Sequence, residues 1–186
     1  RVAHLDNDQG EYDSRERWQQ LCNANKTSFD EIIKGRLLRY AERPKLYAAD
    51  PKSIDGWKWV CDGLAMLIID SLAQLMPGID PNSPQFADGL YMLREVSEST
   101  GASIVIPAHT GKPKDGPQVA LEHMIRGTSA ILAAAGATYV ITVDKNGVRL
   151  VHMVKKALGT RGHHVQTFAL PFKHIDDGSN VDGLHI

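Results

Sequence analysis

The chain has 186 residues, 42% of them hydrophobic and 23% charged, with a formal net charge of −1, a composition ordinary for one globular domain. The near-neutral charge gives no argument for nucleic-acid binding, and no apolar run approaches the roughly 20 residues that a transmembrane helix needs. Two cysteines, Cys22 and Cys61, are too few for a disulfide framework or a cysteine metal site, so composition excludes a membrane-spanning or disulfide-stapled protein and fits the cytoplasm best.

The chain opens with a short apolar strand, predicted over residues 2–5, that ends in an acidic turn. Asp6, Asn7 and Asp8 follow the strand. Because Asp and Asn are common turn residues, these side chains fit a solvated turn as well as a second acidic tip beside the central strand. The chain starts at Arg1 and enters this strand at once, so we expect the sequence to be part of a longer protein.

Two helices are predicted after this strand. Asp13 followed by Glu16 has the spacing of a capping box, which pairs a side chain at the start of a helix with one three residues later. Ser28 followed by Glu31 repeats this spacing before a helix that we expect to continue to Pro44. The basic side chains of the second helix would form its solvent-exposed face.

Residues 64–78, LAMLIIDSLAQLMPG, are predicted to hold the central strand, preceded by a helix over residues 53–62. The apolar run over residues 65–69 leads directly into Asp70, which is typical of a strand buried on both faces of a parallel sheet. Ligands of open α/β sheets bind at the carboxyl ends of the strands. Asp70 is therefore placed where a magnesium–nucleotide site would lie.

A helix and a second apolar strand are predicted to follow. Ser83 before a proline has the pattern of a helix N-terminus, and Gly101 has that of a helix end. Residues 103–107 then form an apolar strand that brings His109 to the same edge of the sheet as Asp70.

The last third of the chain is predicted to be antiparallel. Asn146 with Gly147 lies between two apolar runs, which is the strongest short signal for a hairpin. The three strands expected here are residues 139–143, 148–154 and 165–170.

Alternating strands and helices followed by antiparallel strands predict an α/β fold with a mostly parallel sheet. We expect its core over residues 1–172 and a loosely ordered tail over residues 173–186. Three strand tips would carry Asp8, Asp70 and His109. Phosphoryl transfer uses such a set, in which one carboxylate holds Mg²⁺, a second orients the attacking water and a polar side chain senses the γ-phosphate.

In this order and spacing, the motifs resemble those of RecA-like P-loop ATPases of the AAA type, in the branch of the RepA and DnaB-like hexameric helicases. LIIDSLAQLMP resembles the Walker B strand of that family. VIPAHTGK and RGTSAILAAAGATYVI resemble the next strand, its sensor position and the following helix and strand. VAHLDNDQG resembles the strand that ends in the catalytic acid. The resemblance implies a RecA-like three-layer fold.

The resemblance also implies roles for individual residues. Asp70 corresponds to the Walker B aspartate, which holds Mg²⁺, and Ser71 to its neighbour at the nucleotide. Asp8 falls at the position of the catalytic acid, where glutamate is usual. His109 matches the polar sensor at the end of its strand. The implied cofactors are ATP and Mg²⁺.

Contacts with DNA and with neighbouring subunits are implied in the same way. Lys112 and Lys114 match a loop that faces the central channel of related rings and touches single-stranded DNA. Arg126 and Gly127 match a motif near the phosphates or the subunit boundary. Lys156 falls at the start of a Lys-x-Arg pair that reaches a neighbour's nucleotide, but leucine stands at the arginine position. The implied assembly is a homo-oligomeric ring, with a hexamer suspected.

One motif of the family is absent. No stretch fits G-x-x-x-x-G-K-[ST], the Walker A loop whose backbone N–H groups hold the phosphates. In the family this loop lies upstream of the first strand seen here, so we expect the sequence to be truncated before it, to lack the strand that carries it and to be inactive alone. The resemblance then implies the C-terminal part of an ATPase of a DNA-replication helicase or related motor.

Two alternatives stay open. Aspartate at the catalytic-acid position and the missing arginine also fit a regulatory nucleotide-binding module without motor activity. A metal-binding domain using His152, His163 and His164 is a remote alternative, because adjacent histidines on a strand point to opposite faces.

Overall fold

A computed structural model describes most of the chain. The described residues are 1–6, 11–35, 37–40, 50–110, 121, 128–155, 167–170, 173–176 and 182–185. Within them, no helix is long and apolar enough to cross a bilayer.

A parallel sheet lies at the centre of the fold. Its strands are β1 (Val2–Asp6), β2 (Leu37–Tyr40), β3 (Met66–Asp70) and β4 (Ser103–Val105), in the order β2-β1-β3-β4. Every neighbouring pair is parallel. The prediction that the run before Asp70 forms a central strand is confirmed, because β3 pairs with a strand on each side.

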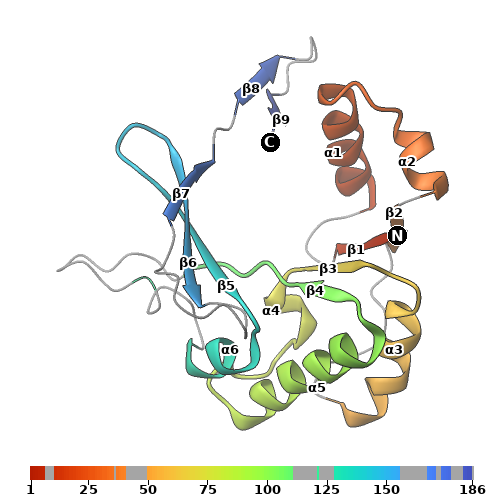
Figure 1. Ribbon diagram of the computed structural model, residues 1–186, viewed down its shortest axis with the longest axis vertical. Helices are drawn as coiled ribbons and strands as arrows, with labels where there is room; N and C mark the ends of the chain where they lie inside the picture. The colour runs from red at the N-terminus through yellow and green to blue at the C-terminus, as the bar shows by residue number, and fades with distance from the viewer. Residues whose placement is uncertain are drawn as a thin grey trace.

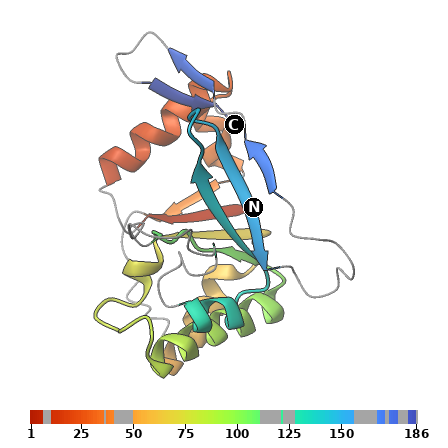
Figure 2. The ribbon, with the colours of Figure 1, turned by 90° about the vertical axis from the view of Figure 1, so that its left-hand side faces the viewer.

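Helices cover both faces of this sheet, so the fold has three layers (Figures 1 and 2). On one face lie α1 (Glu11–Ala24) and α2 (Phe29–Gly35). On the other lie α3 (Ile54–Cys61), which follows the 3₁₀ turn η1 (Pro51–Ser53), and α4 (Leu72–Leu75), α5 (Pro84–Thr100) and α6 (Thr128–Ala134).

The main core lies between the sheet, α3 and α5. Leu67 and Ile69 of β3 are fully buried in it, together with Trp57 of α3 and Val96 of α5. Side chains alternate between the two faces of a strand. Ile68, which lies between Leu67 and Ile69, therefore faces the opposite layer, and so do the residues in register with it on β1 and β4. This alternation decides which polar side chains of β1 and β3 share a face.

The remaining strands are antiparallel. A second sheet contains β5 (Thr138–Val143), β6 (Arg149–Lys155) and β7 (Thr167–Leu170), in the order β5-β6-β7. The predicted hairpin is confirmed: Asp144 Oδ1 accepts hydrogen bonds from the backbone N–H groups of Asn146 and Val148, both at 2.8 Å. Gly147 in this turn has a φ of +79°, which favours glycine.

The predicted caps of the helices are partly confirmed. Ser83 Oγ accepts a hydrogen bond from the Phe86 N–H at 3.3 Å, and Gly101 ends α5 in the left-handed conformation. Ser28 Oγ accepts from the Glu31 N–H at 3.4 Å. The capping box at Asp13 is wrong, because α1 begins at Glu11 and Asp13 lies within it.

Two predicted elements are also wrong. The helix expected to run to Pro44 ends at Gly35, and the next described residues form β2. Pairing with β1 stabilises an extended conformation there, so the tertiary context overrides the helical pattern. The tail expected to be loosely ordered contains β8 (Lys173–Asp176) and β9 (Asp182–His185), which form an antiparallel pair.

Candidate functional site

Two aspartates lie side by side at the carboxyl edge of the parallel sheet. Asp6 is the last residue of β1 and Asp70 the last residue of β3, and the two are in register. Neighbouring strands are about 4.8 Å apart, and residues in register point to the same face. Asp6 is buried, with 7% of its surface exposed. The arrangement therefore gathers negative charge in a shielded place, where a bound cation would offset the repulsion between the carboxylates.

Ser71 adds a buried hydroxyl beside this pair. The residue is 2% exposed, and among the residues that the structure describes its Oγ has no hydrogen-bond partner. Leaving a buried hydroxyl unpaired costs about 1–3 kcal/mol, so a ligand that bonded to it would recover that free energy. The Asp70–Ser71 peptide bond is cis. The backbone continues into α4, where the Leu72 N–H donates to the Pro107 carbonyl at 2.9 Å and joins the end of β3 to the segment after β4.

His109 lies on this segment after β4. It is exposed and borders a cavity of about 1000 Å³ between β4 and β5. His109 follows Pro107 by two residues. The hydrogen bond from the Leu72 N–H to the Pro107 carbonyl therefore holds this segment close to the end of β3. The structure thus places Asp70, Ser71 and His109 at one end of the sheet.

A partly buried hydrogen bond between Trp18 and His4 supports the strand that carries Asp6. Trp18 Nε1 of α1 donates a hydrogen bond to His4 Nδ1 of β1 at 3.1 Å, and the two rings meet edge to face with centroids 5.6 Å apart. An Nδ1 that accepts a bond leaves the imidazole proton on Nε2. His4 is two residues before Asp6 and points to the same face of β1. The contact therefore fixes α1 over the strand that carries Asp6.

Sequence reasoning did not single out His4, and it left Asp6 open between a solvated turn and an acidic tip beside the central strand. The signal was present as alternation: His4 and Asp6 are polar, whereas Ala3 before His4 and Leu5 between the two are buried in the main core. A strand with core residues on one face and polar residues on the other directs those polar groups to a single side.

Several predicted site residues lie outside the described part of the chain. These are Asp8, Lys112, Lys114, Arg126, Gly127 and Lys156, together with His163 and His164 of the remote metal-site alternative. His152, the third histidine of that alternative, forms a 2.8 Å hydrogen bond with the Thr142 hydroxyl. Within the residues that the structure places, no group of three or more His, Cys, Asp or Glu side chains could hold a metal ion.

The residues present at the edge fit a magnesium–nucleotide complex. Mg²⁺ is a hard cation that is usually held by one or two carboxylates and by phosphate oxygens, with several waters retained. Asp6 and Asp70 would supply the carboxylates, and Ser71 would offer a buried hydroxyl. His109 is exposed, so a phosphate oxygen can approach its ring from solvent.

Comparisons with known proteins agree with this reading of the fold. The profile of a family described as AAA domain matches residues 1–115. A solved structure described as an ATPase domain has a similar fold, with a TM-score of 0.65 at 14% sequence identity, covering 92% of this chain and 70% of that one. No curated protein sequence matches. The predicted RecA-like α/β fold is confirmed by this structural likeness.

Proposed function

Because this chain belongs to the AAA domain family, we propose that it forms the magnesium-binding and water-activating part of an ATP-hydrolysing, helicase-like motor. The observation that carries the proposal is the register of Asp6 with Asp70 beside the unpartnered hydroxyl of Ser71. Two carboxylates in register at the carboxyl edge of a parallel sheet, one of them buried, are suited to a metal–phosphate ligand.

Each residue has a chemical task in this proposal. Asp70 would hold Mg²⁺, directly or through a water, and the bound ion would neutralise charge on the transferred phosphoryl group. Asp6 would accept a hydrogen bond from the attacking water and so orient it, a role for which the resemblance suggests Asp8. His109 would donate a hydrogen bond to the γ-phosphate, and the Ser71 hydroxyl would donate to an oxygen of the ligand shell.

The phosphate-cradling loop is proposed to come from sequence outside these 186 residues, because no stretch of them fits it. The further contacts implied by the resemblance belong to the same proposal. They are a ring of subunits, single-stranded DNA at Lys112 and Lys114, and a subunit boundary near Arg126, Gly127 and Lys156. A role in DNA replication is the output that best fits such a motor.

Magnesium-dependent ATP hydrolysis tests the proposal. We expect none from the 186 residues alone and turnover from a longer form that includes a Walker A loop. In that form, Asp70→Asn should lower turnover by about 10²–10³, the usual effect of removing a group that stabilises transition-state charge. Asp62→Asn makes the same chemical change on the exposed C-cap residue of α3, which precedes β3, and should change turnover less than about twofold.

The test has two outcomes that count against the proposal. Magnesium-dependent turnover by the bare 186 residues would show that the missing loop is dispensable. Equal turnover of the Asp70→Asn and Asp62→Asn variants would remove Asp70 from the mechanism.

A regulatory module is the second candidate, favoured by the aspartate at position 8 and by Leu158 at the place of the expected arginine. This candidate predicts nucleotide binding by the longer form without turnover. Equilibrium binding of a fluorescent ATP analogue, measured beside hydrolysis, separates the two.

A further inference from the structure

One face of α1 is turned toward the parallel sheet. Ser14, Trp18 and Cys22 follow one another at intervals of four residues, the spacing that places side chains on one face of a helix. Ser14 and Cys22 are buried, and Trp18 is half-buried. Because Trp18 donates its hydrogen bond to His4 of β1, this face of α1 covers the strand that ends at Asp6.

α1 runs in the opposite direction to β1. Strands β1 and β2 are parallel, so the chain between them, which includes α1, returns from the carboxyl end of β1 to the amino end of β2. α1 is the first helix of this return and begins at Glu11, five residues after Asp6. Its residue Trp18 meets His4, two residues before the end of β1. The helix therefore starts near the carboxyl end of β1 and runs back over the sheet (Figure 2).

This geometry places Ser14 over Asp6. Ser14 precedes Trp18 by four positions, which is about 6 Å along a helix. Asp6 follows His4 by two positions, which is about 6.6 Å along a strand. Because α1 and β1 run in opposite directions, both steps lead from the contact of Trp18 with His4 toward the carboxyl edge of the sheet. Ser14 thus faces the place where Asp6 and Asp70 lie in register.

The hydroxyl of Ser14 is buried without a protein partner. Ser14 is 2% exposed, and its Oγ forms no hydrogen bond with any residue that the structure describes. A buried hydroxyl without a partner destabilises the folded state. Serine is also a weaker helix former than alanine, so packing alone does not explain a serine at this position. A small molecule that bonded to the hydroxyl would offset both effects.

We propose that Ser14 is a further residue of the site and that its hydroxyl holds a water molecule together with Asp6. Buried waters are stable where two to four polar groups surround them. The Ser14 hydroxyl and the Asp6 carboxylate are two such groups, and Asp70 beside Asp6 is a third. A carboxylate has about four acceptor positions, so each aspartate can accept from the water in addition to its other contacts.

Two acceptors orient the water. The Asp6 carboxylate accepts a hydrogen bond from one O–H of the water, and Ser14 Oγ accepts from the other. With both protons held, an oxygen lone pair points away from the two acceptors. That this lone pair is directed at the γ-phosphate rests on the proposed function, whereas the sharing of a water by Ser14 and Asp6 does not.

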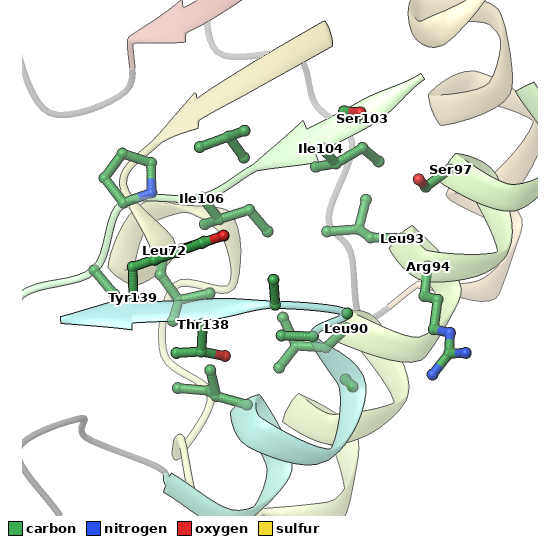
Figure 3. A pocket seen from close by; sticks show the side chains of 18 of the residues that line it. Leu72, Leu90, Leu93, Arg94, Ser97, Ser103, Ile104, Ile106, Thr138 and Tyr139 are labelled. Carbon is green, nitrogen blue, oxygen red and sulfur yellow. The ribbon is translucent and has the colours of Figure 1, made fainter. Parts of the chain in front are cut away.

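Urea denaturation of the 186-residue chain tests the coupling of Ser14 to Asp6. Ser14→Ala should shift the urea midpoint by amounts that differ by at least roughly 0.3 M between the parent chain and an Asp6→Ala background, because the water loses its second holder there. Ser97→Ala is the matched control. Ser97 lies on α5 beside the cavity between β4 and β5 (Figure 3), and its Oγ donates to the Ala102 carbonyl at 2.7 Å. Its shift should be the same in both backgrounds.

A crystal structure of the chain tests the water directly. We expect an ordered water within about 3.2 Å of both Ser14 Oγ and a carboxylate oxygen of Asp6, the usual limit for a hydrogen bond. In the Ser14→Ala variant this water should be absent or displaced, while the Trp18–His4 hydrogen bond that positions α1 stays in place.

ATP hydrolysis by the longer form tests the role of the water. Ser14→Ala should lower kcat about three- to tenfold, the effect of one lost hydrogen bond. It should leave KM for ATP unchanged, because the hydroxyl contacts the water and not the nucleotide. A general loosening of the site would change kcat and KM together. Ser97→Ala, in the opposite layer, should change neither.

Three results would overturn the proposal. They are equal midpoint shifts of Ser14→Ala in the two backgrounds, a well-ordered crystal structure with no water between Ser14 and Asp6, or full turnover of Ser14→Ala in a longer form that Asp70→Asn inactivates. The first two measurements use no nucleotide. If Asp70→Asn retains turnover, the proposed function fails, and the first two measurements still decide whether Ser14 and Asp6 share a water.

Discussion

The contact between Trp18 and His4 should be a major support of the layer formed by α1. Trp18→Phe keeps an aromatic ring against His4 but removes the N–H that donates to His4 Nδ1 at 3.1 Å. His4 is 9% exposed, so Nδ1 loses a donor in a place that water reaches poorly. A buried acceptor left in this way costs about 1–3 kcal/mol, and we expect the free energy of unfolding to fall by that amount.

Urea denaturation followed by far-UV circular dichroism measures this loss. Trp59→Phe is the matched control, because it makes the same chemical change on a residue of α3 that is 74% exposed, and it should change the free energy of unfolding by less than about 0.5 kcal/mol. A double-mutant cycle with His4→Leu should give a coupling energy of about 1 kcal/mol between His4 and Trp18. Equal losses for the Trp18 and Trp59 variants, or zero coupling, would refute the reasoning.

Three further predictions concern the core, a helix cap and a buried thiol. Leu67→Ala should lower the free energy of unfolding by about 2–5 kcal/mol because Leu67 is fully buried in β3, whereas Val143→Ala, at a 64% exposed position, should stay within about 0.5 kcal/mol; equal values in thermal denaturation would contradict the assigned core. Ser83→Ala should cost about 1 kcal/mol in urea denaturation by removing the cap of α5, and no loss would mean that the bond to Phe86 is not formed in solution. Burial raises the pKa of the Cys61 thiol from 9.0 to about 11, so its neutral form is favoured in the folded state and its contribution to stability, complete below pH 9, is lost as the pH rises toward 11. The difference in unfolding free energy between the parent chain and Cys61→Ala should shrink over that pH range, and a constant difference would show that Cys61 does not titrate there.

Local signals in the sequence were sufficient for the centre of the fold. The apolar run ending at Asp70 has no polar residue to place on a solvent face, so it fits only a strand covered on both sides. The Asn146-Gly147 turn and the cap at Ser83 depend on residues within a few positions of each other. Such features are visible in the sequence because the interactions that stabilise them are short in range.

The features that were missed depend on partners far away in the sequence. Residues 37–40 continue a helical pattern, and only the open edge of β1 makes them a strand. The sequence left Asp6 open between a turn and an acidic tip, because its position opposite Asp70 comes from the register of β1 on β3, which joins residues 64 positions apart. Register is set by how the apolar faces of whole strands fit the core, and a short motif does not record it.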